Sequence, residues 1–501
     1  MTIRQVTIGQ LKERVVVIGS GLGGLECGFI LAKAGMQVTV LEKEPQTGGC
    51  LQTFPRGGIR FDTGLHYVGG LDENGSLRPL FDYFGLMNLP WKRLDEDCFD
   101  EVVIGDKHFA LAQGHERFVE TLAAKFPAEK TNLKTYAEML RQVGLHIWDS
   151  LNPRDVNDFY GNSLFAKSAY EWLEATIQDP LLRKVLSGGS LKLELDRERL
   201  PLYVFAQINN SFIQSAWRLR GGGGQIADRL VEQIEQFGGR VRTRAEVTEL
   251  IEKDGRLAEV EINGEERIPC EWVISDVHPA VTLDLVKESS VLRGIYRRRI
   301  ERLQNSFGIF TVNIRLLPNE LLYRNKNMFL HRADADLWNV RTDRVESVLV
   351  HFYPTEDGGR YAQAIDLLTP MRKDDLPAWK SDRPGHRGAE YEAFKREKAA
   401  ECIRFASKYL PGLEEAVDAF WTSTPLTYEH YTGTRDGSAF GVTKDWQSPM
   451  TTVLSSTTPI PNLLLTGQSL NLHGVLGTSM TSLFTTAQML GKEKIKQEIK
   501  I

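Results

Sequence analysis

The chain has 501 residues, of which 42% are hydrophobic, 25% charged and 9% aromatic. These proportions are ordinary for soluble globular proteins and exclude a disordered, collagen-like or coiled-coil chain. The 61 basic and 66 acidic residues give a formal charge of −5, so the chain lacks the basic excess that is typical of nucleic-acid-binding proteins. At roughly 150 residues per domain, the length predicts about three domain-sized units.

The cysteines and the N-terminus indicate the kind of compartment. Five cysteines are scattered without a CxxC spacing, which argues against a disulfide framework and against a structural zinc site. The start, MTIRQVTIGQLKE, has no apolar core of a signal peptide, and no apolar run approaches the roughly 18 residues of a membrane-spanning helix. We therefore expect a reduced, cytoplasmic protein. Attachment to a membrane surface stays compatible with this composition, because it needs only an exposed apolar patch.

A nucleotide-binding pattern begins at Arg14. Residues 15–18 form a short β-branched run, which is typical of a strand buried on both faces of a parallel sheet. The sequence GSGLGG follows at 19–24, then a predicted helix over 25–34 and a second strand over 37–41. This order supplies the βαβ context that a GxGxxG motif needs in order to be informative.

Each part of this pattern has a chemical reason. Gly19 permits the tight turn, Gly21 lets the backbone approach a pyrophosphate, and Gly24 allows the helix to pack closely on the strand. The helix N-terminus offers unpaired N–H groups and a positive dipole end to the phosphates. Glu42, 18 residues after Gly24, is placed to accept hydrogen bonds from a ribose. The pattern predicts a dinucleotide site.

The residues after Glu42 distinguish FAD from NAD. Residues 42–50 read EKEPQTGGC, and residues 61–70 read FDTGLHYVGG. Motif by motif, this extension resembles the glutathione-reductase-like flavoproteins of the phytoene desaturase, carotenoid isomerase and retinol saturase family, with the retinol saturase branch resembling it most. In that family a Gly-Gly pair past the ribose carboxylate passes close to the FAD, and an FDxGxH-like segment runs toward the flavin.

The resemblance implies an α/β fold, with a discontinuous glutathione-reductase-like Rossmann domain that binds FAD and an α+β cap domain for the substrate. The residues that it assigns to FAD in the first segment are Gly19, Gly21, Gly23, Gly24, Leu25, Glu42, Lys43, Gly48, Gly49, Cys50, Gly64, Leu65 and His66.

A second cofactor segment is expected after residue 217. The run RLRGGGG at 218–224 precedes an amphipathic helix over 225–237, and we predict no strand before it, which argues against a second phosphate site. Two strands around the turn dipeptide Asp254-Gly255 form a hairpin pattern, and residues 272–276 look like a strand that returns to the sheet. The resemblance places Val247 beside the adenine.

The third segment is a buried strand at 463–465, a glycine-broken loop and a helix that runs through Leu490. It resembles the C-terminal FAD motif of the family, in which the loop lies against the isoalloxazine; the residues concerned are Gly467, Gln468, Gly474, Val475 and Gly477. A helix N-terminus pointed at the N1/O2 edge of the flavin favours the reduced state, because reduced flavin carries negative charge there.

The expected domain boundaries follow from these segments. We assign residues 14–98, 218–291 and 449–501 to the FAD-binding domain, and residues 99–217 and 292–448 to the substrate or cap domain. The first cap segment is mainly helical in pattern, and the second mixes strands with one long helix over 388–409. The basic run Arg297-Arg298-Arg299 is expected to be a solvated face.

Several chemistries are missing from the sequence: there is no serine-hydrolase elbow, HExxH, EF-hand or P-loop, and no second GxGxxG in βαβ context. A nicotinamide cofactor, NAD(P)H, would then visit transiently without a Rossmann unit of its own, or electrons would come from another external carrier. Flavin carries out the redox step, while the protein supplies orientation and a proton donor or acceptor. The candidates for that proton role are His66, Tyr67, His430 and His473.

The combined motifs predict an FAD-dependent oxidoreductase that reduces a conjugated C=C bond of a polyene or isoprenoid lipid, as retinol saturases do. Relatives with the same motifs also catalyse desaturation and redox-neutral cis–trans isomerisation, so the motifs do not fix the direction of electron flow. The alternative of another class is a non-enzymatic lipid carrier on the same scaffold, as in the Rab GDP-dissociation inhibitors. The intact glycine turn with Glu42 argues against that alternative.

Overall fold

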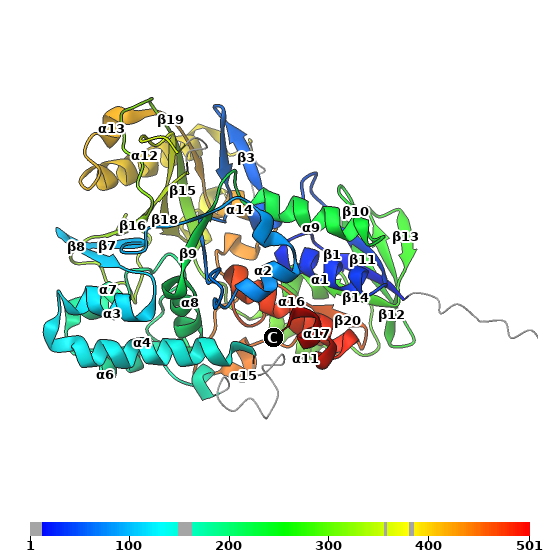
Figure 1. The fold of residues 1–501 in the computed structure, drawn as a ribbon. Helices are drawn as coiled ribbons and strands as arrows, with labels where there is room; N and C mark the ends of the chain where they lie inside the picture. Colours follow the sequence, from blue (N-terminus) through cyan, green and yellow to red (C-terminus); the bar gives the residue numbers. More distant parts are fainter. Residues whose placement is uncertain (1–12, 149–162, 355–357, 380–384, 501) are drawn as a thin grey trace, which may run out of the picture.

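A computed structural model describes residues 13–148, 163–354, 358–379 and 385–500, with the side chain of Trp148 outside the described part. Two halves lie side by side (Figure 1). The half on the right contains a parallel sheet and carries the N-terminal glycine motif. The half on the left contains a larger mixed sheet and a group of helices, coloured cyan and green.

The nucleotide-binding half is organised around a five-stranded parallel sheet. Its strands, in order across the sheet, are β10 (Arg240–Arg242), β2 (Gln37–Leu41), β1 (Arg14–Ile18), β14 (Trp272–Ser275) and β20 (Leu463–Leu465). They come from three distant parts of the chain, as the prediction of a discontinuous domain requires.

The central strand β1 is buried on both faces, which explains its unbroken apolar run, whereas the edge strand β10 is partly exposed and carries two arginines. Val15 and Val17 of β1 face a core formed with the helices, whereas Val16 and Ile18 face a second core formed with a small antiparallel sheet. The helices on the first face are α1 (Leu22–Lys33), α9 (Gly224–Gln236), α16 (Gly474–Leu490), α17 (Lys492–Ile499) and α2 (Arg78–Tyr83). The small sheet on the second face consists of β11 (Val247–Lys253), β12 (Arg256–Ile262) and β13 (Glu266–Pro269).

The cap half contains a seven-stranded sheet. Its order is β19 (Val417–Ser423), β15 (Gly308–Leu316), β18 (Ala364–Met371), β17 (Ser347–Phe352), β16 (Asn327–His331), β7 (Asp100–Ile104) and β8 (Lys107–Leu111). Only the β16–β7 pair is parallel. On one face Val348 and Val350 pack with α12 (Gly388–Ser407) and the neighbouring α13 (Leu413–Ala416). On the other face Leu349 and Leu368 belong to the core that surrounds the candidate site.

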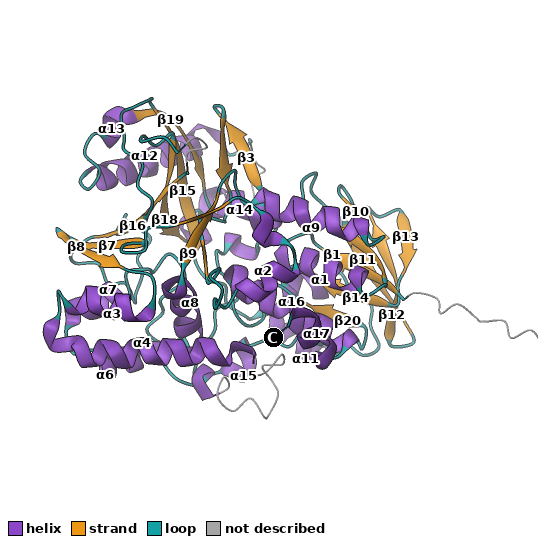
Figure 2. Cartoon of the chain, in the orientation of Figure 1, coloured by secondary structure: helices purple, strands orange, loops and turns teal. Residues whose placement is uncertain are grey.

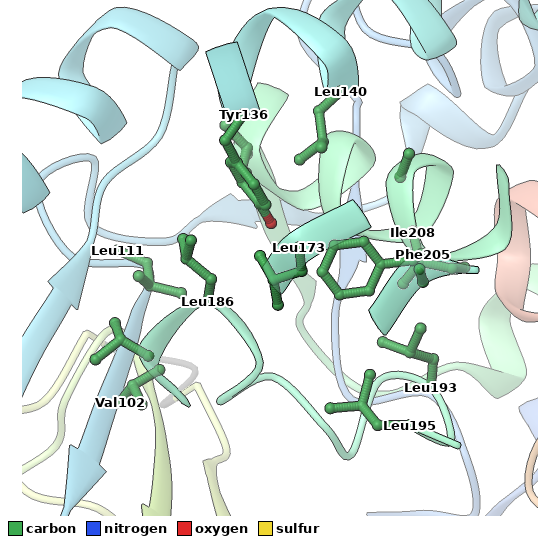
Figure 3. Packing of buried hydrophobic residues seen from close by; sticks show 14 of the residues in the cluster. Val102, Leu111, Tyr136, Leu140, Leu173, Leu186, Leu193, Leu195, Phe205 and Ile208 are labelled. Carbon is green, nitrogen blue, oxygen red and sulfur yellow. The ribbon is translucent and has the colours of Figure 1, made fainter. Parts of the chain in front are cut away.

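A helical layer covers that second face (Figures 2 and 3). Its helices are α3 (His115–Ala123), α4 (Lys130–Leu145), α6 (Ala169–Thr176), α7 (Pro180–Leu186) and α8 (Leu202–Gln214). Figure 3 shows Tyr136, Leu173 and Phe205 packed together from α4, α6 and α8, with Val102 of the sheet below them. Ile208 of the same α8 lines the cavity described below, so this core holds one wall of the site.

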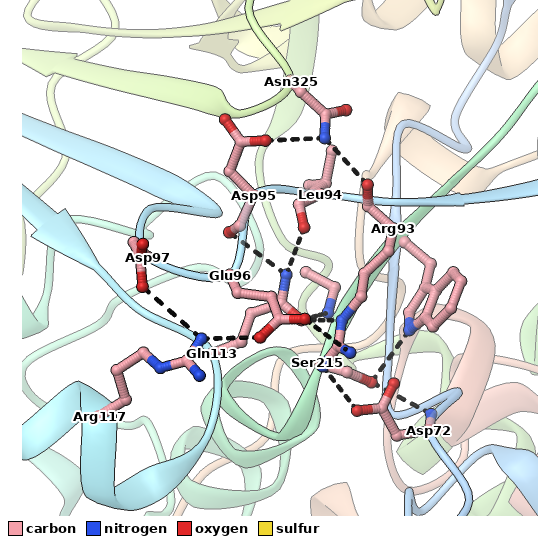
Figure 4. A network of polar contacts seen from close by, with 12 residues as sticks. Asp72, Arg93, Leu94, Asp95, Glu96, Asp97, Gln113, Arg117, Ser215 and Asn325 are labelled. Atoms are coloured by element: carbon pink, nitrogen blue, oxygen red, sulfur yellow. Dashed lines mark hydrogen bonds and ion pairs between the residues drawn. The ribbon is translucent and has the colours of Figure 1, made fainter.

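A small three-stranded sheet connects the two halves. It consists of β5 (Val68–Gly69), β9 (Ala216–Leu219) and β6 (Trp91–Arg93). A polar network fixes it (Figure 4): Arg93 forms ion pairs with Asp72 at 2.7 Å and Glu96 at 3.1 Å, and Gln113 Oε1 accepts from Arg93 Nε at 2.9 Å and from the Ala216 N–H at 3.2 Å. Because β5 directly follows the FDTGLHY segment, this network positions that segment.

Three expectations are corrected by the structure. The glycine run at 221–224 does follow a strand, β9, yet it does not line the cavity: the Gly223 N–H donates to Asp62 Oδ1 at 2.6 Å instead. Helix α11 (Gly294–Glu301) packs with the core of the nucleotide-binding half through Ile300, so the boundary expected at 292 lies one helix too early. Arg297 of that helix is not merely solvated, because its guanidinium donates to the carbonyls of residues 283 and 286.

The remaining elements lie beside these layers. They are the short strands β3 (Thr53–Arg56) and β4 (Ile59–Asp62), and the helices α10 (Pro279–Asp284), α14 (Pro425–Thr432) and α15 (Pro449–Thr452). In the described part of the chain no helix is long and apolar enough to cross a membrane.

Candidate active site

A cavity of about 490 Å³ lies between the two halves, and it is lined by all three segments of the nucleotide-binding half and by both segments of the cap. At one end it is lined by Glu42, Ala245 and Val247, and elsewhere by the β1–α1 turn and by the N-terminus of α16. The rest of the cavity reaches the inner face of the seven-stranded sheet. Its residues therefore come together only in the folded chain.

The β1–α1 turn has the geometry expected of a phosphate-binding turn. Gly19 has φ +91°, and a Cβ on Gly24 would lie 2.2 Å from the Gly19 carbonyl oxygen. Gly21 lines the cavity, whereas Gly23 packs against the backbone of Gly467. Thus Gly21 offers its surface to a ligand, and Gly23 and Gly24 serve helix packing. Leu25, also assigned to FAD from the resemblance, is fully buried within α1 and does not line the cavity.

The carboxylate of Glu42 is held firmly at the end of β2. It accepts hydrogen bonds from the Ser20 N–H at 3.0 Å, the Ser20 hydroxyl at 2.6 Å and the Glu44 N–H at 2.9 Å. Glu42, Lys43 and Glu44 all line the cavity. Val247, at the start of β11, lines the same end. An acidic side chain beside an apolar wall suits a ribose and an adenine.

Asp276 is a residue of this region that the sequence analysis did not single out. It directly follows β14 and lines the cavity, and a Cβ added to Gly21 would lie 2.5 Å from its Oδ2 atom. Burial, with Glu42 nearby, raises the pKa of Asp276 to about 7. The carboxyl at the glycine turn therefore changes its charge near neutral pH, and its neutral form is the one compatible with an anion beside it.

The segment after Glu42 lies along the cavity as expected. Gly48, Gly49 and Cys50 line it, followed by Gly64 and Leu65. Gly48 and Gly49 have φ values of +110° and +53°, so glycine relieves backbone strain there. Burial raises the pKa of the Cys50 thiol, so this cysteine is not an activated nucleophile.

The C-terminal segment closes the other side. Gln468, His473, Gly474 and Val475 line the cavity at the N-terminus of α16. Gly467, with φ +94°, lies just behind them against Asp276, and a Cβ on Gly477 would lie 2.3 Å from the Leu472 carbonyl oxygen. Gly467 and Gly477 thus shape the loop and do not line the cavity.

His66 lines the cavity, and its side chain is largely buried. Its side chain is 12% exposed, and its Nδ1 lies 3.8 Å from Oδ2 of the fully buried Asp366 on β18. Within the described residues, Nδ1 is a buried atom with no hydrogen-bond partner. Burial lowers the pKa of His66 to about 4 and raises the pKa of Asp366 to about 8. At neutral pH the proton of this pair therefore resides on Asp366.

Tyr67 and His473 line the cavity, and each has a fixed partner. The Tyr67 hydroxyl donates to Asp100 Oδ2 at 2.9 Å, and His473 Nε2 contacts the Lys192 carbonyl oxygen at 3.1 Å. His430, in contrast, lies on an exposed part of α14 and does not line the cavity. The structure therefore separates His430 from the other three candidates.

The part of the cavity under the cap has a mainly apolar wall. Its apolar lining residues are Leu191, Ile208, Phe212, Ile309, Leu349, Leu368, Ala439 and Phe440. Phe212 of the first cap segment lines the cavity, whereas Phe118 and Phe205 lie in the core. This wall suits a water-insoluble ligand.

Together, these features fit a flavin adenine dinucleotide. Two helices, α1 and α16, direct their N-terminal N–H groups toward one cavity. Gly21 lines this cavity and has no side chain that would keep a pyrophosphate away, and the Glu42 carboxylate lines it where a ribose could donate hydrogen bonds. In the described part of the chain, no group of three or more His, Cys, Asp or Glu residues is arranged to hold a metal ion.

Comparisons with known proteins agree with this geometry. Residues 17–84 match the model of the NAD(P)-binding Rossmann-like domain family. Over 98% of its length the chain is 28% identical to the all-trans-retinol 13,14-reductase of Homo sapiens, and it covers 87% of that protein. The chain is thus similar to the all-trans-retinol 13,14-reductases over nearly its whole length. It is also 23% identical to a prolycopene isomerase of Daucus carota, over 87% of this chain and 73% of that protein.

Solved structures confirm the fold. A putrescine oxidase has a TM-score of 0.64 at 16% identity, covering 98% of this chain and 100% of its own. An oxidoreductase from Methanosarcina mazei has a TM-score of 0.62 at 18% identity, covering 94% and 99%. The predicted α/β fold, the resemblance to the retinol reductase and carotenoid isomerase group, and the assignment to the oxidoreductases are thus confirmed. These matches also support a flavin as the cofactor.

Proposed function

We propose that this homologue of the retinol reductases uses FAD to reduce a conjugated C=C bond of a polyene or isoprenoid lipid. The observation that carries the proposal is the continuity of the cavity: Glu42 and the glycine turn line one part, and Leu349 and Leu368 of the cap sheet line another. A dinucleotide bound along the first part would meet an apolar substrate in the second. Bound FAD, once an external electron donor has reduced it, would supply the hydride for such a reduction.

The chain itself would supply the proton. His66 is neutral at pH 7, since burial lowers its pKa to about 4, and the residue lines the cavity. We assign Nε2–H of His66 as the donor to the substrate carbon, while the proton held by Asp366 moves to Nδ1 across the present 3.8 Å gap. Two neighbouring groups whose pKa values are pushed apart are a usual sign of an acid–base pair.

The helix α16 and the apolar wall have supporting roles. The N-terminus of α16 would favour negative charge on the reduced cofactor, and the apolar lining would keep water away from the reacting carbon. Residues 17–84 match the Rossmann-like domain model, and in this proposal they bind FAD. The electron donor would therefore be an external carrier, such as NAD(P)H that binds transiently. Peripheral contact with a membrane would give access to an apolar substrate.

Anaerobic photoreduction tests the proposal. Purified protein loaded with FAD should show flavin absorbance bands that bleach on photoreduction and recover when all-trans-retinol is added. A flavin that stays reduced while the polyene changes only its isomer pattern would support a redox-neutral isomerase instead. A protein that takes up no FAD would contradict both and favour a lipid carrier.

A further inference from the structure

A buried ion pair lies in the wall of the cap cavity and has no part in the proton transfer proposed above. Lys192 Nζ lies 3.1 Å from Asp100 Oδ2, and the two side chains are 5% and 0% exposed. Asp100 also accepts from the Tyr67 hydroxyl at 2.9 Å and, through its other oxygen, from Asn327 Nδ2 at 2.9 Å. Lys192 and Tyr67 line the cavity, whereas Asp100 lies behind them.

The lysine is surrounded by aromatic rings. Its Nζ lies 5.0 Å from the ring centre of Phe212, 5.4 Å from that of Phe329 and 5.8 Å from that of Phe99. In the described part of the chain its ammonium has one hydrogen-bond acceptor, Asp100. An ammonium has three N–H donors, so two of them have only ring faces or a ligand as partners.

A second cation lies behind this pair. Arg218 is 1% exposed, and its guanidinium donates to Asn327 Oδ1 at 2.6 Å; Asn327 in turn donates to Asp100. Lys192 therefore contacts the carboxylate of Asp100 directly, and Arg218 is linked to it through Asn327.

Packing alone does not explain these charges. Replacing a buried ion pair by apolar residues is often neutral or stabilising for a protein, because desolvation offsets much of the attraction. A hydrocarbon substrate would cover Lys192 and leave its remaining N–H groups unpaired, which is costly in a dry cavity. A substrate with an oxygen acceptor would satisfy them.

We propose that Lys192 and Tyr67 form an anchor for the oxygen-bearing terminus, hydroxyl or carboxylate, of an otherwise apolar substrate. The proposal rests on the function proposed above and narrows its substrate class to oxygenated polyenes. A hydroxyl accepts from the Lys192 ammonium and donates to the phenolic oxygen of Tyr67, whose own proton is directed to Asp100. A carboxylate accepts from Lys192 and gains from the surplus positive charge. Lys192 thereby acts as a residue that determines specificity.

The test compares three polyenes of one length on the FAD-loaded protein: all-trans-retinol, all-trans-retinoic acid, and axerophthene, in which hydrogen replaces the hydroxyl of retinol. Sites built to hydrogen-bond a hydroxyl reject the analogue that lacks it by large factors. We expect the wild-type protein to bind retinol or retinoic acid at least about 100-fold more tightly than axerophthene. Equal binding of the three would overturn the proposal.

Two variants test whether the preference for oxygenated polyenes depends on Lys192. Lys192→Met should weaken binding of the oxygenated polyenes and leave axerophthene binding within about threefold, since the methionine keeps the apolar stem. The double variant Lys192→Met with Asp100→Asn removes both charges and keeps the test valid if the single variant does not fold. Lys184→Met is the matched control, because this half-buried lysine donates to the Ala333 carbonyl and does not line the cavity.

The outcomes separate this anchor from the proposed function. An unchanged preference in the folded Lys192 variants would overturn the anchor. If axerophthene binds as tightly as retinol and reoxidises the flavin at the same rate, the anchor fails and the reductase stands. If the preference depends on Lys192 but none of the three polyenes reoxidises the flavin, the anchor stands and the reductase fails.

Discussion

Replacing Asp366 by asparagine removes the proton from the His66 pair while leaving its surroundings nearly unchanged. Asp366 accepts from the Tyr353 hydroxyl at 2.5 Å and from Asn313 Nδ2 at 2.7 Å. Burial raises its pKa to about 8, so at pH 7 a neutral acid is exchanged for a neutral amide of the same shape. We therefore expect the free energy of unfolding to change by no more than about 1 kcal/mol and FAD binding to be retained.

The rate of polyene reduction should respond much more strongly. A positioned general acid contributes about 10²- to 10⁴-fold, so Asp366→Asn should slow the reoxidation of reduced flavin by a polyene by a factor in that range. The wild-type rate constant should be constant below pH 8 and fall about tenfold per unit above it, because Asp366 must be protonated to donate. In the variant this decline should disappear.

Anaerobic stopped-flow absorbance of the flavin, recorded from pH 6 to pH 10, measures both effects. Asp366→Glu, which restores a carboxyl group, should recover part of the rate. Wild-type rates with an unchanged basic limb in Asp366→Asn would refute the assignment of this pair as the proton donor.

Four further outcomes follow from the site. Gly24→Ala should abolish FAD loading, because its Cβ would lie 2.2 Å from the Gly19 carbonyl oxygen and must move out to at least 3.0 Å. The control Gly28→Ala, on the same helix, meets only side-chain atoms, the nearest at 3.1 Å, and should keep FAD. Flavin absorbance at equal protein concentration measures both. FAD affinity, titrated by flavin fluorescence, should fall as pH rises through about 7, because Asp276 with its raised pKa ionises there beside the bound anion. Asp276→Asn should remove this pH dependence. A pH dependence that persists in the variant would contradict the placement of the FAD phosphates beside Asp276. Ala439→Phe should fill the cap cavity and weaken polyene binding more than tenfold without loss of FAD, so equal binding would place the polyene elsewhere. His430→Gln should retain the wild-type rate of flavin reoxidation, since His430 does not line the cavity, whereas His66→Gln should lose roughly 100-fold.

The nucleotide-binding half was predictable because its signals are local in the chain. The strand, the glycine turn at residues 19–24 and Glu42 lie within 29 residues of Arg14. Each needs a particular kind of residue: β-branched residues in the strand, glycine in the turn and an acidic residue for the ribose. The hairpin around Asp254-Gly255 was recognised for the same reason. The β9 strand was missed because Arg218 interrupts its four residues, Ala216–Leu219, so that they do not form an apolar run like the one at 463–465.

His66 and Tyr67 were recognised as candidates, but their partners Asp366, Asp100 and Lys192 were not predictable in this way. His66 and Asp366 are 300 positions apart in the sequence, and Tyr67, Asp100 and Lys192 come from three separate segments. A lone lysine or aspartate in a chain that is 25% charged carries no signal of its own. Their burial arises only when the cap sheet and its helical layer close over the cofactor half, so three-dimensional packing was required to find them.

The mass of the product from one anaerobic turnover tests the central claim most directly. Photoreduced, FAD-loaded protein is mixed with a limiting amount of all-trans-retinol, and the extracted polyene is measured by mass spectrometry while the flavin spectrum is followed. A reductase whose flavin and polyene share one cavity should give a product heavier by two hydrogen atoms, in an amount equal to the flavin that is reoxidised. A product of unchanged mass beside a flavin that stays reduced would contradict the account.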